Sequence, residues 1–370
     1  MSKTRTEDFV NVCQKLDQLR FEGTIDWGVL GENIHKNNTL TASTRLFLFW
    51  LCSLIDQFYP YRRIWIDGER AMLVLLKDNP HSFSDVNDKI VNLRKDRKMN
   101  TLGEIFFGQS KFTLVRDDYD RIKNSFDYLS QYIMSERNLS RRFVHLLGEL
   151  IDYCSGDHGI LKMAYFLDGR LFSNTRVTAT PSSRELERFR DKPRKRLWMF
   201  LMFMRRDPSL LTLFREALVE IQGETCGEKL YETWCNPTKF NPHDLELPSD
   251  MWNQRLFNAL IGRFDFHTKK SKKIARELAT KYAISPSVFD VTFELGANKC
   301  RYKECVKCPF GDNGRCHKGE RKFCSIYSWL FPYYTKNEKR LSLCNLEMCP
   351  IGQDLGKKLC SREINKNVKH

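Results

Sequence analysis

The sequence predicts an all-α fold that ends in a metal-binding region. Apolar residues recur three and four positions apart along most of the chain, whereas the alternation typical of strands is scarce. Hydrophobic residues make up 41% of the 370 residues, which is enough to build a substantial core and excludes wholesale disorder. A dense group of cysteines near the C-terminus predicts the metal-binding region.

Helical spacing is clearest in the first half of the chain. The predicted helices are Val10–Leu19, Thr44–Phe58, Gly68–Leu76, Tyr119–Met134, Arg141–Cys154 and Gly159–Leu167. Ser43 and Ser140 directly precede two of these ranges and are predicted to cap them. Cys52 and Cys154 fall inside apolar segments, where cysteine behaves as a small hydrophobe.

The middle of the chain predicts a helix–hairpin–helix outline. A short helix ends near Arg190, a break follows at Asp191–Arg194, and the apolar helix Lys195–Met204 comes next. Pro208 suits the first position of another helix, which extends to Gln222. The remaining predicted helices are Met251–Ile261, Lys269–Tyr282 and Pro286–Leu295.

The charge of the chain favours a nucleic-acid partner. The net charge is +15, and the basic residues are clustered. The segment from Arg184 to Arg206 contains nine Lys or Arg and three acidic residues. The segment from His267 to Lys281 contains six Lys or Arg and one acidic residue. Two such patches are suited to contact a phosphate backbone.

Nothing in the sequence indicates export or a membrane span. The N-terminus lacks the layout of a signal peptide, and the apolar stretch Leu46–Ile55 is too short to cross a bilayer. We therefore expect a cytoplasmic, intracellular protein whose thiols stay reduced. The odd total of thirteen cysteines also argues against a complete disulfide framework.

Eight of the cysteines lie between Cys300 and Cys360, in two groups. The first group, with the spacing C-x4-C-x2-C-x7-C, is Cys300, Cys305, Cys308 and Cys316. Four thiolates this close predict a [4Fe–4S] cluster, with zinc as the alternative, because structural zinc sites usually pair two C-x2-C knuckles and this run has one. A second metal site is the expectation for Cys324, Cys344, Cys349 and Cys360. The alternatives are four free thiols and a single cluster that takes ligands from both groups.

Four stretches resemble the iron–sulfur members of the helix–hairpin–helix DNA glycosylases, of which endonuclease III is one. Lys195–Leu201 is similar to the helix that opens with the family's catalytic lysine, and Leu247–Asp250 stands where the family has P-x-D-T-H. Phe289–Gly296 resembles the helix before the cluster loop, and the first cysteine group resembles that loop. The resemblance covers roughly residues 140–316 and implies a two-lobed helical fold.

The chain also departs from the family pattern. The glycine-rich hairpin turn is replaced by Lys192-Pro193-Arg194, so phosphate contacts there would rely on side chains. Met251 and Trp252 replace the threonine and histidine that follow the aspartate, and Ser209–Thr233 looks like an insertion.

The resemblance implies catalytic roles for two residues. Asp250 would stabilise the cationic sugar or activate water, although an N-cap is the simpler role for an aspartate at a helix start. Lys195 would attack the sugar, although it also suits a phosphate contact. Trp198, Phe200, Phe203, Trp252 and Phe257 are candidates to receive a flipped base, but aromatic residues at helical spacing are more often core. The predicted DNA-contacting residues are Lys192, Arg194, Arg196, Lys269, Lys270 and Arg301.

The expected function is therefore excision of a damaged or modified base from double-stranded DNA, with lyase activity as an addition. The alternatives are an inactive iron–sulfur DNA-binding module and a zinc-stabilised nucleic-acid-binding protein. The expected domains are a helical region (1–140), a glycosylase-like core (141–299) and a cysteine-rich domain (300–370).

Overall fold

The computed structural model describes residues 39–54, 116–248 and 268–290, except Asn174, Arg176 and Pro193, together with scattered positions between Glu7 and Phe21. The regular secondary structure of these residues is helical and contains no strand, which agrees with the predicted all-α class for this part of the chain. None of the helices in the described ranges is long and apolar enough to cross a membrane. The chain divides into two compact units, residues 28–245 and residues 1–27 with 246–370.

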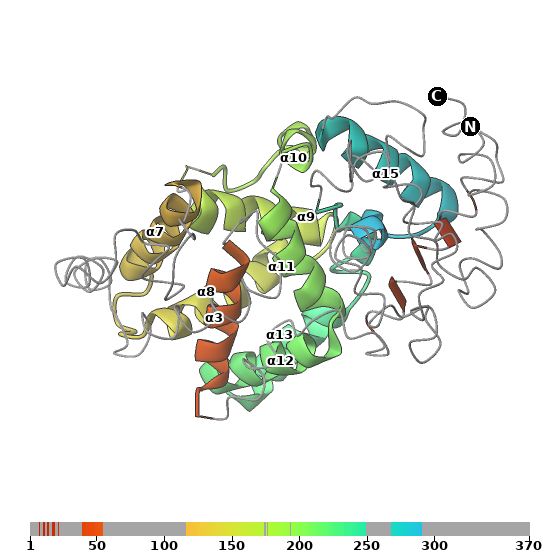
Figure 1. Cartoon of the computed structure of the whole chain (residues 1–370). Coiled ribbons are helices and arrows are strands. Elements are labelled where there is room, and N and C mark those ends of the chain that lie inside the picture. The colour runs from red at the N-terminus through yellow and green to blue at the C-terminus, as the bar shows by residue number, and fades with distance from the viewer. Residues whose placement is uncertain are drawn as a thin grey trace, which may run out of the picture. The chain divides into compact units, whose positions relative to one another are not determined.

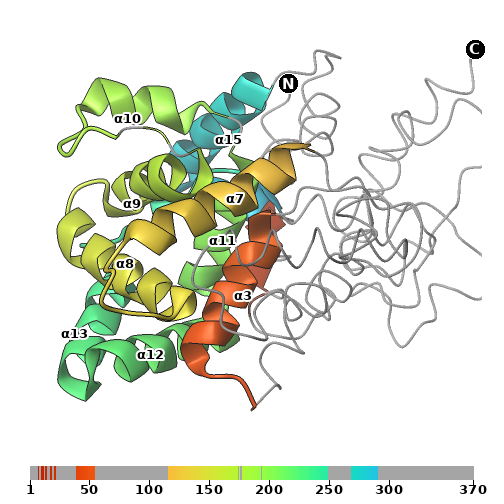
Figure 2. The same ribbon diagram turned by 90° about the vertical axis from the view of Figure 1, so that its left-hand side faces the viewer.

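The unit 28–245 is a stack of helices (Figures 1 and 2). Its helices are α3 (Ala42–Leu54), α7 (Arg116–Gln131), α8 (Leu139–Cys154), α9 (Gly159–Leu167), α10 (Ser183–Arg190), α11 (Lys195–Arg206), α12 (Pro208–Gln222) and α13 (Glu224–Cys235). A π-helix, η1 (Asp168–Phe172), follows α9, and a 3-10 turn, η2 (Pro242–Asp244), follows α13. In both views α10 lies at one end of the unit and the pair α12–α13 at the other.

The unit 28–245 crosses the domain boundary expected at residue 140. α3 packs against α8, α11 and α12, and α7 packs against η1 and α8. The reason is that α3 is apolar around most of its circumference, so it is buried only when helices from both sides of residue 140 surround it.

An aromatic cluster joins three of these helices. The ring of Trp50 on α3 meets Phe200 on α11 edge to face, with centroids 4.9 Å apart. Phe143 on α8 lies 5.6 Å from Trp50 and 5.3 Å from Phe47. All four side chains are fully buried, and each contributes about 1.5–3 kcal/mol of transfer free energy.

Two helix caps differ from the sequence predictions. α3 begins at Ala42, two residues earlier than predicted, and the Thr41 hydroxyl before it accepts from the Thr44 amide at 3.3 Å. Asn138, rather than Ser140, caps α8, because its side chain accepts from the Ser140 amide at 2.9 Å. The predicted cap at Ser43 is wrong because this residue lies inside α3, where its hydroxyl binds Glu220 instead.

The segment Ser209–Thr233, which the resemblance marks as an insertion, forms most of the hairpin α12–α13. α13 was not predicted from the sequence. It crosses α12 closely at Gly227, where an added Cβ would lie 2.6 Å from the Val219 backbone. Since α12 and α13 also pack on α8, and α12 on α3, this hairpin is part of the core.

The described part of the second unit is centred on α15 (Thr268–Tyr282), which packs against η3 (Pro286–Asp290). α15 agrees with the predicted helix to within one residue. Its Arg276 forms a 3.3 Å ion pair with the fully buried Glu246. The predicted helices Gly68–Leu76 and Met251–Ile261 lie outside the described residues.

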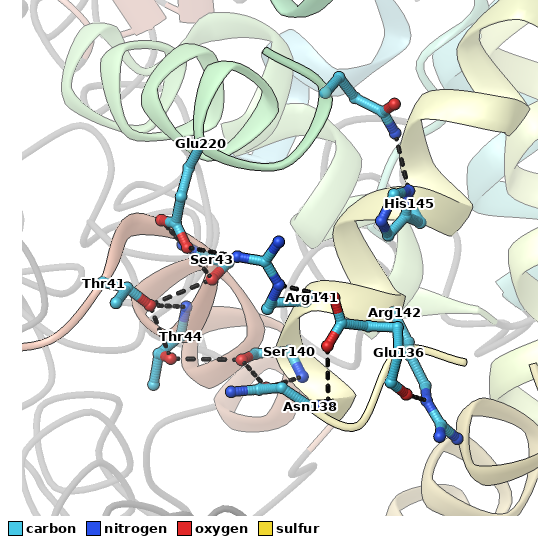
Figure 3. A network of polar contacts seen from close by, with 11 residues as sticks. Thr41, Ser43, Thr44, Glu136, Asn138, Ser140, Arg141, Arg142, His145 and Glu220 are labelled. Atoms are coloured by element: carbon cyan, nitrogen blue, oxygen red, sulfur yellow. Dashed lines mark hydrogen bonds and ion pairs between the residues drawn. The ribbon is translucent and has the colours of Figure 1, made fainter. Parts of the chain in front are cut away.

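A polar network ties the N-termini of α3 and α8 to the end of α12 (Figure 3). The Glu220 carboxylate accepts from the backbone amide and the hydroxyl of Ser43, at 3.0 and 2.7 Å. The hydroxyls of Thr44 and Ser140 lie 3.2 Å apart and link the first turns of α3 and α8. Arg141 pairs with Glu136 at 2.7 Å and with Glu220 at 3.9 Å. The network therefore supplies partners that the two helix starts lack.

Replacing Glu220 with alanine should lower the free energy of unfolding by about 1–2 kcal/mol, because it removes an anion bound to an α3 amide and hydroxyl. Glu216→Ala is the matched control. It also removes a contact from α12 to α3, an exposed ion pair with Arg45 of 2.9 Å, and should lower stability by less than about 1 kcal/mol. Urea unfolding of both variants measures the difference, and equal losses would contradict the role assigned to Glu220.

Candidate nucleic-acid interface

The first helix of the hairpin, α10, is fixed by its own N-terminus. Ser182 and Glu185 form a capping box, in which the Glu185 amide donates to the Ser182 hydroxyl at 3.3 Å and the Ser182 amide donates to Glu185 at 2.9 Å. The backbone and hydroxyl of Ser182 hold the pKa of Glu185 below its usual value. Leu186 and Phe189 are buried on the side of α10 that faces α9. A helix of only eight residues is thus anchored at its start and along one face.

A tight turn then connects α10 to α11. The Lys192 amide donates to the Phe189 carbonyl, and the Arg194 amide donates to the Lys192 carbonyl, both at 2.9 Å. α11 begins at Lys195, and the Trp198 amide donates back to the Arg194 carbonyl at 3.1 Å. The predicted order of a short helix, a tight turn and a longer helix is therefore confirmed, and the turn carries Lys192 and Arg194.

Arg194 is held by three different groups. Its Nε lies 2.5 Å from Oδ1 of Asp168, and its Nη2 donates to the Ser173 hydroxyl at 3.2 Å. The guanidinium also lies over the Phe172 ring, 5.4 Å from its centroid. Since all three partners follow α9 in the chain, these contacts fasten the hairpin turn to η1 and the residue after it.

Asp168 is the buried partner in this arrangement. It opens the π-helix η1, which the Ser173 amide closes by donating to the Asp168 carbonyl at 2.7 Å. Asp168 is 3% exposed, and Lys192 is a second cation at 3.9 Å. Burial raises the pKa of the Asp168 carboxyl, and the nearby charges of Arg194 and Lys192 offset this only in part.

The predicted DNA-contacting residues have different surroundings. The Lys192 side chain is half exposed, whereas that of Arg194 is about a quarter exposed. Arg196 is only 4% exposed, and its guanidinium lies 3.9 Å from the Met199 sulfur. Arg196 is therefore a core residue in this structure and does not present its charge to a phosphate, because α11 is buried on nearly all sides.

The aromatic residues of α11 also belong to the core. Trp198 and Phe203 are buried, as is Phe200 in the aromatic cluster described above. Trp198 packs on Phe189 of α10 at 6.0 Å between ring centroids, which ties the two hairpin helices together. For these three residues the core interpretation is confirmed, while Trp252 and Phe257 lie outside the described residues.

Of the two predicted catalytic residues, one lies in the described part of the chain. Lys195 is the first residue of α11 and is partly exposed, whereas Asp250 lies outside the described residues. Lys269 and Lys270 belong to α15, in the other unit. Outside the described residues lie Arg301 and both cysteine groups, namely Cys300, Cys305, Cys308, Cys316, Cys324, Cys344, Cys349 and Cys360.

The described part of the chain holds no group of side chains that could bind a metal ion. Cys52 and Cys154 are buried, as predicted for core cysteines, and burial raises the pKa of the Cys154 thiol to about 12. Cys226 on α13 is exposed. Asp168 is a residue of the candidate site that the sequence motifs did not indicate. The sequence signal that could have found it is an acidic residue placed directly after the apolar run of α9 and before Leu171 and Phe172.

Because the pKa of Asp168 is raised in the folded protein, the sign of its effect on the pH dependence of stability can be predicted. The folded protein binds this proton more tightly than the unfolded chain does, so the contribution of this group to stability is largest in acid. It declines as the pH rises from the usual value of 3.8 through the raised folded value. Asparagine has no such proton. The unfolding free energy of the parent protein minus that of Asp168→Asn should therefore fall over this window, as measured by urea unfolding at a series of pH values. A rise would contradict the assignment.

Comparison of the chain with protein-family models, with curated proteins and with solved structures gave no match.

Proposed function

We propose that the chain is an iron–sulfur DNA glycosylase of the helix–hairpin–helix type, which hydrolyses the N-glycosidic bond of a damaged or modified base. The observation that carries the proposal is the hairpin α10–α11. Its turn carries Lys192 and Arg194, and its second helix opens at Lys195, the residue that corresponds to the family's catalytic lysine. The net charge of +15 and the cysteine run after Phe289–Gly296 support it further.

In this proposal the hairpin turn binds the DNA backbone. Because the turn lacks the glycine-rich sequence of the family, it presents side chains rather than a row of backbone amides. Lys192 is the more exposed of the two cations and would make the phosphate contact directly. Lys269 and Lys270 on α15, with Arg301, would make further phosphate contacts.

The proposed chemistry needs one carboxylate. Asp250 would stabilise the positive charge that develops on the sugar as the base departs with the electron pair of the glycosidic bond. Water then adds to C1′ and gives its proton to Asp250 or to solvent. In place of water, the neutral amine of Lys195 would add to C1′ and lose a proton. Opening of the C1′–O4′ bond, with a proton going to O4′, would then give an imine, which is the start of lyase chemistry.

A second candidate function is DNA binding without base excision. It is favoured by the replacement of the family's threonine and histidine by Met251 and Trp252. The burial of Trp198, Phe200 and Phe203 also leaves these three rings unable to receive a flipped base.

Asp250→Asn should reduce base release by about a hundredfold or more while leaving DNA affinity unchanged. Asparagine is itself a good helix N-cap, so a capping role alone predicts no loss. The matched control is Asp207→Asn, at the aspartate that caps α12 by accepting from the Leu210 amide at 3.0 Å. The measurement is base release from a panel of duplexes that each carry one defined lesion. Undiminished release by Asp250→Asn sinks the catalytic role, and no release by the parent protein from any duplex favours the second candidate.

Metal content tests the cofactor. Anaerobic purification should give a brown protein with about four irons per chain, or about eight if the second cysteine group binds a cluster as well. Cys308→Ser should lose the colour and iron of the first cluster, whereas Cys226→Ser, which removes an exposed cysteine of the helical unit, should retain both. A colourless protein with stoichiometric zinc would instead support the zinc-stabilised alternative.

A further inference from the structure

The carboxylate of Asp168 has no role in the chemistry proposed above, although it contacts Arg194 in the turn that would bind DNA. Its side chain is 4% exposed, whereas its cationic partners Arg194 and Lys192 reach solvent at 27% and 49%. One negative charge and two positive charges leave this cluster with a net charge of +1. A buried acid beside an intended phosphate site weakens the local positive field, so its presence needs another explanation.

Stability does not supply that explanation. Burying a carboxylate is costly, and a buried ion pair often contributes no more to stability than neutral side chains of similar size. The raised pKa of Asp168 agrees, since it means that the two cations do not fully offset the burial of the charge. The charged form of Asp168 therefore weakens the fold relative to the neutral form.

The contacts of Arg194 explain why a carboxylate is buried here. Arg194 has contacts on three sides, with the Asp168 carboxylate, the Ser173 hydroxyl and the Phe172 ring. Ser173 and Phe172 belong to or directly follow η1, the π-helix that Asp168 opens. Within the turn, the Lys192 and Arg194 amides donate to the Phe189 and Lys192 carbonyls at 2.9 Å. The side chain of Arg194 thus links a short turn to a buried part of the unit.

We propose that Asp168 is a positioning residue for DNA binding, which fixes the α10–α11 turn through Arg194 so that Lys192 is presented to a backbone phosphate. The inference rests on the proposed function, because it takes DNA as the ligand of this turn. A turn ordered before binding loses less conformational entropy when it binds, which raises affinity. Asp168 therefore improves DNA binding even though its charge repels DNA.

The test compares Asp168→Asn with Asp244→Asn. Asp244 pairs with Arg190 at the end of α10, at 3.3 Å, so the two variants change the net charge by the same amount and each removes a carboxylate from one arginine. For the parent protein and both variants, fluorescence anisotropy gives the Kd for a labelled duplex at several salt concentrations. Hydrogen exchange followed by mass spectrometry gives the protection of the segment 190–197.

In Asp168→Asn the amide hydrogens of the turn should exchange about tenfold faster than in the parent protein. The Kd for DNA should rise by about tenfold, although the variant has lost a negative charge. Asp244→Asn should leave the turn amides unchanged and bind DNA as tightly as the parent protein or slightly tighter. Arg194→Gln should raise the Kd as well, and adding Asp168→Asn to it should have little further effect, because the two residues act through one contact.

Unchanged exchange in Asp168→Asn overturns the positioning role whatever happens with DNA. Faster exchange with an unchanged or lower Kd overturns it as well, because the carboxylate would then act only as a repelling charge. A parent protein that binds no DNA overturns the proposed function and this inference together, whereas DNA binding by the parent protein with an equal Kd for Asp168→Asn overturns this inference alone.

Discussion

The burial of α11 is the constraint on which the rest of the helical unit depends. This helix carries apolar side chains on nearly every face, so it is stable only when surrounded, and α3, α9 and α12 surround it. The rings of Trp50 and Phe143 on α3 and α8 close around Phe200, and Trp198 reaches Phe189 of α10. The direction in which α11 leaves the hairpin is therefore fixed by the core. Because Lys195 is the first residue of α11, its position is fixed by the same packing.

The polar parts of the unit are arranged around this core. At one end, Glu220 and Arg141 bind the starts of α3 and α8, where backbone amides lack partners. At the hairpin, Asp168 binds the turn through Arg194. Both are carboxylates that join segments distant in the chain, but Glu220 receives hydrogen bonds from an amide and a hydroxyl, whereas Asp168 is paired with side-chain cations. This difference explains why the first is expected to stabilise the fold and the second to fix a local geometry.

Helical periodicity predicted the long elements well and their ends less well. α9 and α12 have the predicted bounds because a clear apolar stripe coincides with a start or stop signal, such as Pro208. The caps at Ser43 and Ser140 were wrong because both residues lie inside their helices. The Thr41 hydroxyl and the Asn138 side chain accept from the first-turn amides instead, and the Ser43 hydroxyl binds Glu220 in a distant helix. α13 carries few apolar residues, with Leu230 and Trp234 as its main buried contacts, so its periodicity is weak.

At the candidate site, too, local sequence patterns predicted some features and missed others. The turn with Lys192 and Arg194 was predicted from a local break between two helical patterns. Asp168 could not be predicted in this way, because its partner Arg194 lies 26 positions further along the chain and nothing in either local sequence indicates the pairing. The burial of Arg196 was missed for a related reason, since a charged residue next to exposed cations looks exposed until the packing of the whole helix is known.

The contact between Ser43 and Glu220 spans 177 positions, and it has a consequence for how the protein is made. α3 leaves the ribosome long before α8, α11 and α12, the helices that cover it. During that interval a helix rich in Phe, Leu and Trp lacks these covering helices, and exposed apolar surfaces favour association between nascent chains. Because α12 comes late among these helices, the unit 28–245 can complete its core only after most of the unit has been synthesised.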